Sequence, residues 1–406
     1  MRTPSNYLIL SSLIRYASQF SLTFIFAQTL GPEAVGTFSL SLAIASPIYL
    51  FAGWGLRRLI LTLSRDVSYR TYRTIRTVLS VLAFAIVCAI GFFFAPSHLD
   101  AITLVALIKL SELYLDWANT YLQKASLYSG IVILAGVNAI VTISSVTILG
   151  IITKDLRYTL LGAAVAISIA TTVTVMYSVR RAVSEAEREE PISRPDVWLV
   201  LRSGFPLAVA AMATVLLQTV PQYLLAATNG TSAVGLFAVL MYLTFFSEIV
   251  LNGHAQAWIP VARKIYAEAP QALSVQQALR AARGSSLISI GVSALAILGA
   301  FLLYPLVFGE FFAMKIDYVP PLMLIAACQP LLFFCSTALS VHNSYFKQLI
   351  SSVIAIITTA AVGALIIPTN GATGALWAYA GAVIVRTMVS AIQLSASARS
   401  GRSTDE

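Results

Sequence analysis

Charged residues are scarce in this chain. Asp, Glu, Lys and Arg together make up 11% of its 406 residues, whereas hydrophobic residues make up 58%. Soluble domains contain about 25% charged residues, so this composition excludes a soluble enzyme and a soluble binding module. The mean hydropathy of +0.84 instead predicts a chain that lies in a lipid bilayer.

The chain also has few of the groups that metal or covalent chemistry needs. Its cysteines and histidines are Cys88, Cys328, Cys335, His98, His254 and His342. The histidines are far apart in the sequence. Cys328 and Cys335 would lie about 10 Å apart along one expected helix, which is too far for a disulfide. No nucleotide-binding motif is present. We therefore expect no catalytic residue, no metal and no cofactor.

What the sequence does contain is long apolar stretches. Their approximate ranges are 7–28, 35–61, 76–95, 101–122, 131–152, 158–178, 199–227, 233–257, 284–307, 319–341, 346–367 and 372–394. A helix of about 20 apolar residues crosses a hydrocarbon core about 30 Å thick. Because lipid offers no hydrogen bonds to the backbone, such a segment must be helical. The sequence therefore predicts an all-α polytopic membrane protein with about 12 transmembrane helices.

The basic residues predict the orientation of these helices. With the N-terminus inside, the inner segments hold 17 of the 26 Lys and Arg residues, and the outer loops hold Lys154, Arg157 and Lys315. Cytoplasmic loops of membrane proteins collect Lys and Arg. We therefore expect both termini in the cytoplasm and a location in the bacterial inner (plasma) membrane. The same rule accounts for the net charge of +9, so no nucleic-acid partner is expected.

The chain divides into two halves. The polar segment 181–198, an expected cytoplasmic linker, separates an N-terminal six-helix bundle (1–180) from a C-terminal one (199–406). Segments 27–38 and 226–237 are identical at seven of twelve positions, at an offset of 199 residues. Because each half has an even number of spans, the halves form a parallel repeat about a pseudo-twofold axis along the membrane normal. Transporters built from such repeats bind substrate at the repeat interface.

Span 101–122 carries a polar stripe that continues to residue 123. Lys109, Glu112, Asp116, Asn119 and Gln123 recur every three or four residues, so they share one helix face. An ionisable group facing lipid costs about 2.5–3.5 kcal/mol, and the stripe should therefore line a water-filled cavity or pair with another helix. Lys109 and Glu112, one turn apart, can neutralise each other, which leaves Asp116 without a partner.

Three further arginines lie within or at the end of other spans. Arg15 is one turn from Gln19 in span 7–28, Arg58 lies near the end of span 35–61, and Arg386 lies in span 372–394. Arg15 can alternatively extend to the inner surface. Arg58 and its neighbour Arg57 can alternatively anchor the helix at the interface. Both alternatives stay open at the level of sequence.

The second half of the chain has fewer charged groups within its spans. Gln218 and Gln222 lie one turn apart in span 199–227, and we expect them to line a cavity. Glu248 is the only carboxylate within the spans of this half. We expect Glu248, and Asp116 in the first half, to bind a coupling proton or sodium ion. Glu248 can alternatively pair with Arg386 when a cavity closes.

Three short motifs resemble those of a known family. They are Leu30-Gly-Pro-Glu-Ala-Val-Gly-Thr-Phe38, Gly55-Leu-Arg-Arg58 and Asn370-Gly-Ala-Thr-Gly-Ala-Leu-Trp-Ala378. With the twelve spans in two halves, the chain resembles the Wzx-type polysaccharide flippases. These belong to the superfamily that also holds the multidrug and toxic-compound exporters and the lipid II flippases.

The resemblance implies a V-shaped pair of bundles with a central cationic cavity. The implied partners are the bilayer, the polysaccharide assembly machinery and an undecaprenyl pyrophosphate-linked oligosaccharide, which a monomer would turn from the inner to the outer leaflet. The residues that match such a cavity by type and depth are Arg15, Arg58, Lys109 and Arg386. Glu112 and Asp116 depart from a purely cationic lining.

Two other functions remain open. A drug or cation exporter of the same fold predicts acidic cavity groups without basic ones, whereas the basic set here is at least as large. A membrane-embedded polysaccharide polymerase or ligase predicts a sizeable outer loop, whereas every expected outer loop is short. Moving an isolated anion into hydrocarbon costs tens of kcal/mol. A cavity with Arg or Lys near the phosphates would offset this cost, which is a physical reason to favour the flippase.

Overall fold

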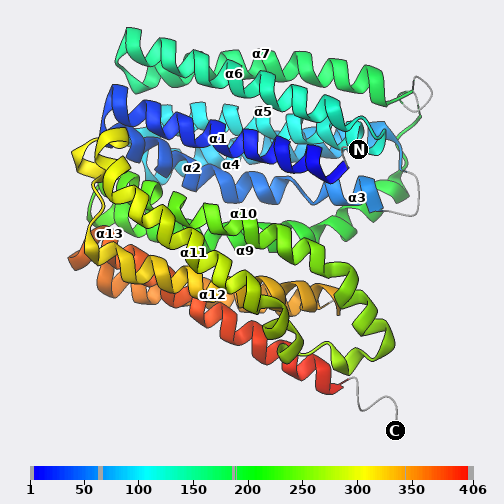
Figure 1. Cartoon of the computed structure of the whole chain (residues 1–406). Coiled ribbons are helices and arrows are strands. Elements are labelled where there is room, and N and C mark those ends of the chain that lie inside the picture. The colour runs from blue at the N-terminus through cyan, green and yellow to red at the C-terminus, as the bar shows by residue number, and fades with distance from the viewer. Residues whose placement is uncertain (1–3, 63–66, 185–187, 189, 343, 401–406) are drawn as a thin grey trace. The chain divides into compact units, whose positions relative to one another are not determined.

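The computed structural model of the chain describes residues 4–62, 67–184, 188, 190–342 and 344–400. Within these ranges the secondary structure is helical, with no β-strand. The chain separates into two compact units, Met1–Met212 and Ala213–Glu406. Figure 1 shows each unit as a bundle of long helices. This confirms the all-helical fold class expected from the sequence.

The first unit contains seven α-helices and the first part of an eighth. Their bounds are α1 (Pro4–Leu30), α2 (Pro32–Ala52), α3 (Leu56–Thr62), α4 (Tyr69–Phe94), α5 (Leu99–Lys124), α6 (Tyr128–Thr153), α7 (Leu156–Ala182) and α9 (Arg194–Thr228), with the 3₁₀ turn η1 (Pro96–His98). Helix α5 packs against α2, α4 and α7, and α1 packs against α6. Helix α5 therefore lies at the centre of the unit.

The second unit contains the rest of α9 and four further α-helices. They are α10 (Thr231–Glu268), α11 (Val275–Phe308), α12 (Val319–Val341) and α13 (Tyr345–Ser400), with the turns η2 (Pro270–Ala272), η3 (Glu310–Phe312) and η4 (Ile316–Tyr318). Helix α12 packs against α10, α11 and α13. Helix α9 runs across the boundary between the units. The expected linker 181–198 lies partly outside the described residues.

Eleven of the twelve predicted spans each follow one helix, and span 35–61 includes α2, the turn at 53–55 and α3. Among the described residues, nine helices are long and apolar enough to cross a membrane, and α10 makes ten when its two segments are taken together. Helix α13 is one of these nine helices, but it contains two predicted spans, 346–367 and 372–394. Gly371 (φ 52°, ψ −129°) interrupts the helix between them. Helix α5, which carries predicted span 101–122, is not among these membrane-crossing helices, because the charged residues of its polar stripe lower its hydropathy.

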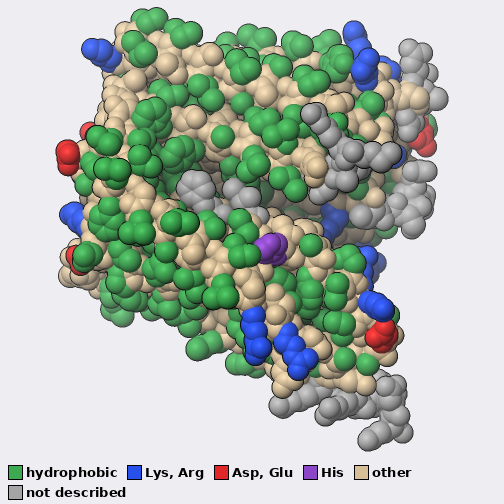
Figure 2. All heavy atoms as spheres, in the orientation of Figure 1, with side chains coloured by type: hydrophobic (Ala, Val, Ile, Leu, Met, Phe, Trp, Pro, Cys, Tyr) green, Lys and Arg blue, Asp and Glu red, His purple; other side chains and the backbone are tan. Residues whose placement is uncertain are grey.

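The outer faces of the helices are apolar. Large hydrophobic side chains are exposed along α4, α6, α7 and α11, and Phe94, Leu287 and Leu365 are 82%, 76% and 78% exposed. Figure 2 shows hydrophobic side chains over the middle of the helices on the visible face of each unit, with Lys and Arg towards the helix ends. Such surfaces are stable in lipid, so the chain is a multi-pass membrane protein.

The repeated sequence segment has the same geometry in both units. Gly31 precedes α2 with φ 85° and ψ −178°, and Gly230 precedes α10 with φ 83° and ψ 172°. This backbone region is essentially restricted to glycine. Four residues later Val35 and Val234 are each fully buried. The shared turn supports the internal repeat that the sequence indicated.

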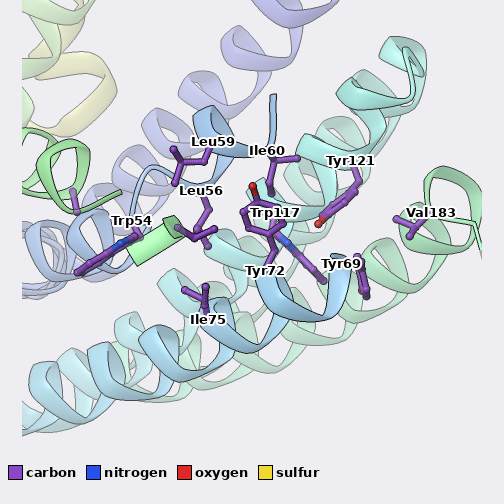
Figure 3. Close-up of a cluster of buried hydrophobic side chains, with 12 residues drawn as sticks. Trp54, Leu56, Leu59, Ile60, Tyr69, Tyr72, Ile75, Trp117, Tyr121 and Val183 are labelled. Atoms are coloured by element: carbon purple, nitrogen blue, oxygen red, sulfur yellow. The ribbon is translucent and has the colours of Figure 1, made fainter. Parts of the chain in front are cut away.

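An aromatic cluster holds α3, α4 and α5 together in the first unit. Trp117 of α5 lies among Tyr69 and Tyr72 of α4 and Leu56 of α3, all buried. The ring centroids of Tyr69 and Trp117 are 5.2 Å apart. Figure 3 shows these side chains converging between the three helices. The cluster fixes the position of α3 beside α5, which matters for the charged pairs described next.

Candidate substrate cavity

The first unit contains an open cavity of about 290 Å³. It is bounded by α1, α2, α5, α6 and α7, and its polar lining residues are Arg15, Ser18, Gln19, Lys109, Glu112, Asp116, Asn138, Thr142 and Thr171. Of the predicted residues, Arg15, Gln19, Lys109, Glu112 and Asp116 meet here. This volume lies at the lower end of the range for small-molecule sites, about 300–1,000 Å³.

Lys109 and Glu112 form an ion pair in the cavity wall. The Lys109 ammonium lies 2.7 Å from a Glu112 carboxylate oxygen, and the two side chains are 15% and 52% exposed. They are one helical turn apart on α5, a spacing that brings side chains together. The sequence allowed Lys109 and Glu112 to neutralise each other, and in the structure they do so. This ion pair adds no net charge to the cavity.

Asp116 pairs with an arginine from another helix. Arg57 of α3 donates one hydrogen bond to Asp116 at 2.9 Å and a second to the side-chain oxygen of Gln123, also at 2.9 Å. Sequence reasoning left Asp116 without a partner, because nothing in the sequence indicated that α3 packs beside α5. Both side chains are about one third exposed, so Asp116 contacts both the cavity and Arg57.

Arg15 is the cavity cation without an ion pair among the described residues. It lies on α1, it is exposed, and it shares the lining with Gln19 one turn later. With Lys109 balanced by Glu112 and Asp116 balanced by Arg57, Arg15 leaves the cavity with a net positive charge. An anionic group is the ligand that such a charge favours.

The opposite wall is neutral and polar. Asn138 of α6 accepts a hydrogen bond from Thr171 of α7 at 3.4 Å and donates one to the backbone of Leu134 at 3.0 Å. These hydroxyl and amide groups can both donate and accept hydrogen bonds, as the hydroxyl groups of a sugar require.

The second unit contains a separate polar cluster. Gln329 of α12 donates a hydrogen bond to Glu248 of α10 at 2.8 Å, and Gln218 of α9 donates one to the hydroxyl of Tyr379 at 3.3 Å. Arg386 lies on the same helix as Tyr379, two turns later, and its Nε has no partner in the described part of the protein. Glu248 makes no ion pair among the described residues.

The remaining predicted residues lie outside the cavity lining. Asn119 is buried on α5, and its side-chain oxygen has no partner among the described residues. Arg58 is exposed on α3, while its neighbour Arg57 makes the contact with Asp116. Gln222 lies in the second unit and is half-buried.

One buried charge lies at the predicted start of a span. The sequence predicted a span that begins at Arg76, but α4 begins at Tyr69, and Arg76 is only 1% exposed. The predicted start is therefore seven residues too late. The sequence did carry a signal: Tyr69, Tyr72 and Arg76 recur at helical spacing, although the surrounding arginines concealed it.

Known proteins identify the family to which this arrangement belongs. The sequence profile of the polysaccharide biosynthesis protein family matches residues 5–266, which is more than half of the chain. The chain belongs to this family. The match covers the first unit and extends nearly to the end of α10. A search of curated protein sequences finds no match.

Solved structures share the fold over almost the whole chain. An inward-facing MATE-family multidrug resistance transporter of the MOP superfamily has a TM-score of 0.70 at 16% identity, with 98% of this chain and 100% of that chain covered. The lipid II flippase MurJ, in an inward closed conformation, has a TM-score of 0.69 at 10% identity, with 95% and 87% covered. The MATE multidrug transporter DinF-BH has a TM-score of 0.62 at 17% identity, with 96% and 93% covered. At these identities the likeness establishes the fold.

Proposed function

We propose that this member of the polysaccharide biosynthesis family is a flippase, and not an enzyme. It moves an undecaprenyl pyrophosphate-linked oligosaccharide from the cytoplasmic to the periplasmic leaflet of the inner membrane by alternating access. The family supports a role in polysaccharide synthesis. The fold, shared with a lipid II flippase and with multidrug transporters, supports transport across the membrane.

The observation that carries this proposal is the cavity in the first unit. It lies among membrane-crossing helices, it contains one cation without an ion pair in the described structure, and its far wall is neutral and polar. Arg15 would hold a phosphate, and the Asn138–Thr171 wall would bind sugar hydroxyl groups. One such charge contact at about 4 Å is worth about 4 kcal/mol at an effective dielectric of 20 and about 1 kcal/mol in water.

The charge pairing argues against the alternative of a cation exporter. A cationic drug needs a carboxylate that is free to bind it, but Glu112 and Asp116 are each engaged by a basic side chain at 2.7 and 2.9 Å. Glu248 is engaged by Gln329 and is better suited to a coupling ion. A proton or sodium gradient acting at Glu248 is the energy source that we propose.

Reconstituted vesicles test the proposal directly. Proteoliposomes would contain undecaprenyl pyrophosphate-linked trisaccharide in both leaflets, and a glycosidase would be added outside. With an active flippase we expect nearly all of the trisaccharide to be cleaved, whereas protein-free vesicles should protect the inner half. If vesicles with the protein protect as much substrate as protein-free vesicles, under an imposed proton or sodium gradient, the proposal is wrong.

A further inference from the structure

Helix α11 has one exposed face along its length. The residues on its opposite face, from Ala278 to Phe308, are buried, and the helix packs against α10 and α12. On the exposed face leucines recur at helical spacing. They are Leu287, Leu295, Leu298, Leu302 and Leu306, and each is between 66% and 76% exposed. In a multi-pass membrane protein such a leucine stripe contacts the acyl chains of lipids.

The length of the leucine stripe matches the thickness of a bilayer. Leu287 and Leu306 are 19 positions apart on α11, which is about 29 Å along an α-helix. The hydrocarbon core of a bilayer is about 30 Å thick. The helical turn that precedes Leu287 therefore lies where acyl chains give way to lipid headgroups.

That end of α11 carries two arginines on the exposed face. Arg283 lies four residues before Leu287, and Arg280 lies one turn earlier, so both continue the leucine stripe. Both side chains are exposed, and neither forms an ion pair among the described residues. The sequence has no acidic residue from position 269 to 309. Two positive charges therefore face the headgroup region, and the described protein does not neutralise them.

The surface beside the two guanidinium groups is open, and the helix beneath them is held in place. Gly284 follows Arg283, and a Cβ atom at this glycine would meet no atom within 4 Å. On the buried side of the same turn, Ser285 shares a hydrogen bond of 2.9 Å with the Nδ1 atom of His254 on α10. A lipid molecule can thus approach the backbone at Gly284 while its phosphate meets the arginines.

The general retention of basic residues on one side of a membrane is a weaker explanation of this pattern. That rule concerns the loops between spans, and it requires no particular helix face. Arg280 and Arg283 lie within α11 and in line with the leucines. Side chains at this spacing have Cβ atoms about 5–6 Å apart, and a guanidinium group binds phosphate through two N–H groups. The two arginines can therefore hold one phosphate diester between them.

We propose that Arg280 and Arg283 form a binding site for the headgroup of an anionic phospholipid, phosphatidylglycerol, of the surrounding bilayer. The attraction of two basic side chains should favour phosphatidylglycerol over phosphatidylcholine about 30-fold at low salt. The bound lipid would hold this end of α11 at the membrane surface. The site is the same in either orientation of the chain and does not depend on the transported substrate.

Fluorescence quenching by brominated lipids measures this preference at one place on the protein. In a variant without the native cysteines, Leu287→Cys would carry a fluorophore. The phosphatidylcholine vesicles would contain a small fraction of brominated phosphatidylglycerol or of brominated phosphatidylcholine. At position 287 we expect the preference of about 30-fold for phosphatidylglycerol, and we expect high salt to reduce it. Leu365→Cys is the matched control position. It is 78% exposed on α13, with no charged residue within two turns, and it should show no preference.

Removing the charges tests which residues cause the preference. Arg280→Gln with Arg283→Gln should bring the preference at position 287 close to one, and the corresponding double change to lysine should keep part of it. Lys154→Gln with Lys315→Gln removes the same formal charge from exposed positions elsewhere and should leave the preference intact. Quenching by brominated phosphatidylcholine should be the same in all variants, which shows that they are folded in the bilayer.

Two results would overturn the site. The first is an equal preference at position 287 in the Arg280→Gln, Arg283→Gln protein and in the lysine control, because the arginines would then not be its cause. The second is an absence of quenching at 287 by either lipid, because another protein surface would then cover this face of α11. Since neither measurement involves transport, failure of the flippase proposal would leave this site unaffected.

Discussion

Arg57 and Asp116 are 59 residues apart in the sequence, and their side chains meet at 2.9 Å across α3 and α5. This pair decides how the charge of the first unit is arranged. It engages the carboxylate that would otherwise attract cations into the cavity, and it connects the cavity to the aromatic cluster around Trp117.

Arg15→Gln should lower flipping about five-fold or more while the amount of protein in the membrane stays normal. The substitution removes the cavity charge that has no ion pair in the described structure. A contact worth about 1–4 kcal/mol changes a binding constant by about five-fold to several hundred-fold. Arg58→Gln, which alters an exposed arginine outside the cavity lining, is the control. Equal activity of both variants would contradict the role given to Arg15.

Lys109→Gln should be more harmful than the double change Lys109→Gln with Glu112→Gln. The single change leaves the Glu112 carboxylate without its partner at 2.7 Å, so the cavity gains a negative charge that repels the phosphate. The double change removes both charges together. The flipping rates of the two variants, compared at matched protein levels, check the order. The reverse order would indicate that Lys109 itself binds the substrate.

Glu248→Gln should remove the dependence of transport on the proton or sodium gradient. Glu248 is the carboxylate of the second-unit cluster, and Gln329 donates a hydrogen bond to it. The substitution keeps the shape and removes the charge that could bind a cation. Transport would be measured in vesicles with each gradient imposed separately. Glu310→Gln, at the exposed end of the same unit, is the control and should keep the native dependence. Unchanged gradient dependence in Glu248→Gln would exclude the site.

Gly31→Ala and Gly230→Ala should each lower the unfolding midpoint of the purified protein. Both glycines have φ near 85° with extended ψ, and an alanine held there costs about 1–3 kcal/mol. Gly284 is a helical glycine of α11 with open space around it, so Gly284→Ala should leave stability unchanged or raise it, by up to about 1 kcal/mol. Similar midpoints for all three variants would show that the turns relax without cost.

The topology predicts which sites are accessible from outside the cell. In a variant without the three native cysteines, Asn229→Cys should react with a membrane-impermeant thiol reagent in intact cells, since 229 lies at the expected outer turn. Arg70→Cys should react only after the membrane is opened. Both side chains are exposed in the structure, so burial does not explain a lack of labelling. Labelling at 70 in intact cells would reverse the proposed orientation.

The sequence determined the helices, because membrane crossing is a local property of about 20 consecutive residues. The predicted stretches follow helices, apart from the turn at 53–55 that divides stretch 35–61. The break in α13 falls at Gly371, within the motif that begins at Asn370. The repeated turns could also be predicted from the sequence, because a backbone conformation that only glycine adopts requires glycine at both positions 31 and 230. The gathering of Arg15 with the α5 stripe in one cavity agrees with the polar faces recognised in the sequence.

Only the tertiary structure decided which charges are paired. Helical spacing brings Lys109 to Glu112, so that pair was foreseeable from residues one turn apart. The partner of Asp116 was not, because it depends on how α3, after the turn at Trp54 and Gly55, packs beside α5. The burial of Arg76 was hidden for a related reason: a run of arginines before an apolar span has the same pattern in a cytoplasmic loop and in a helix whose one face packs against α5. Periodicity identifies a helix face, whereas the packing of distant helices decides what that face contacts.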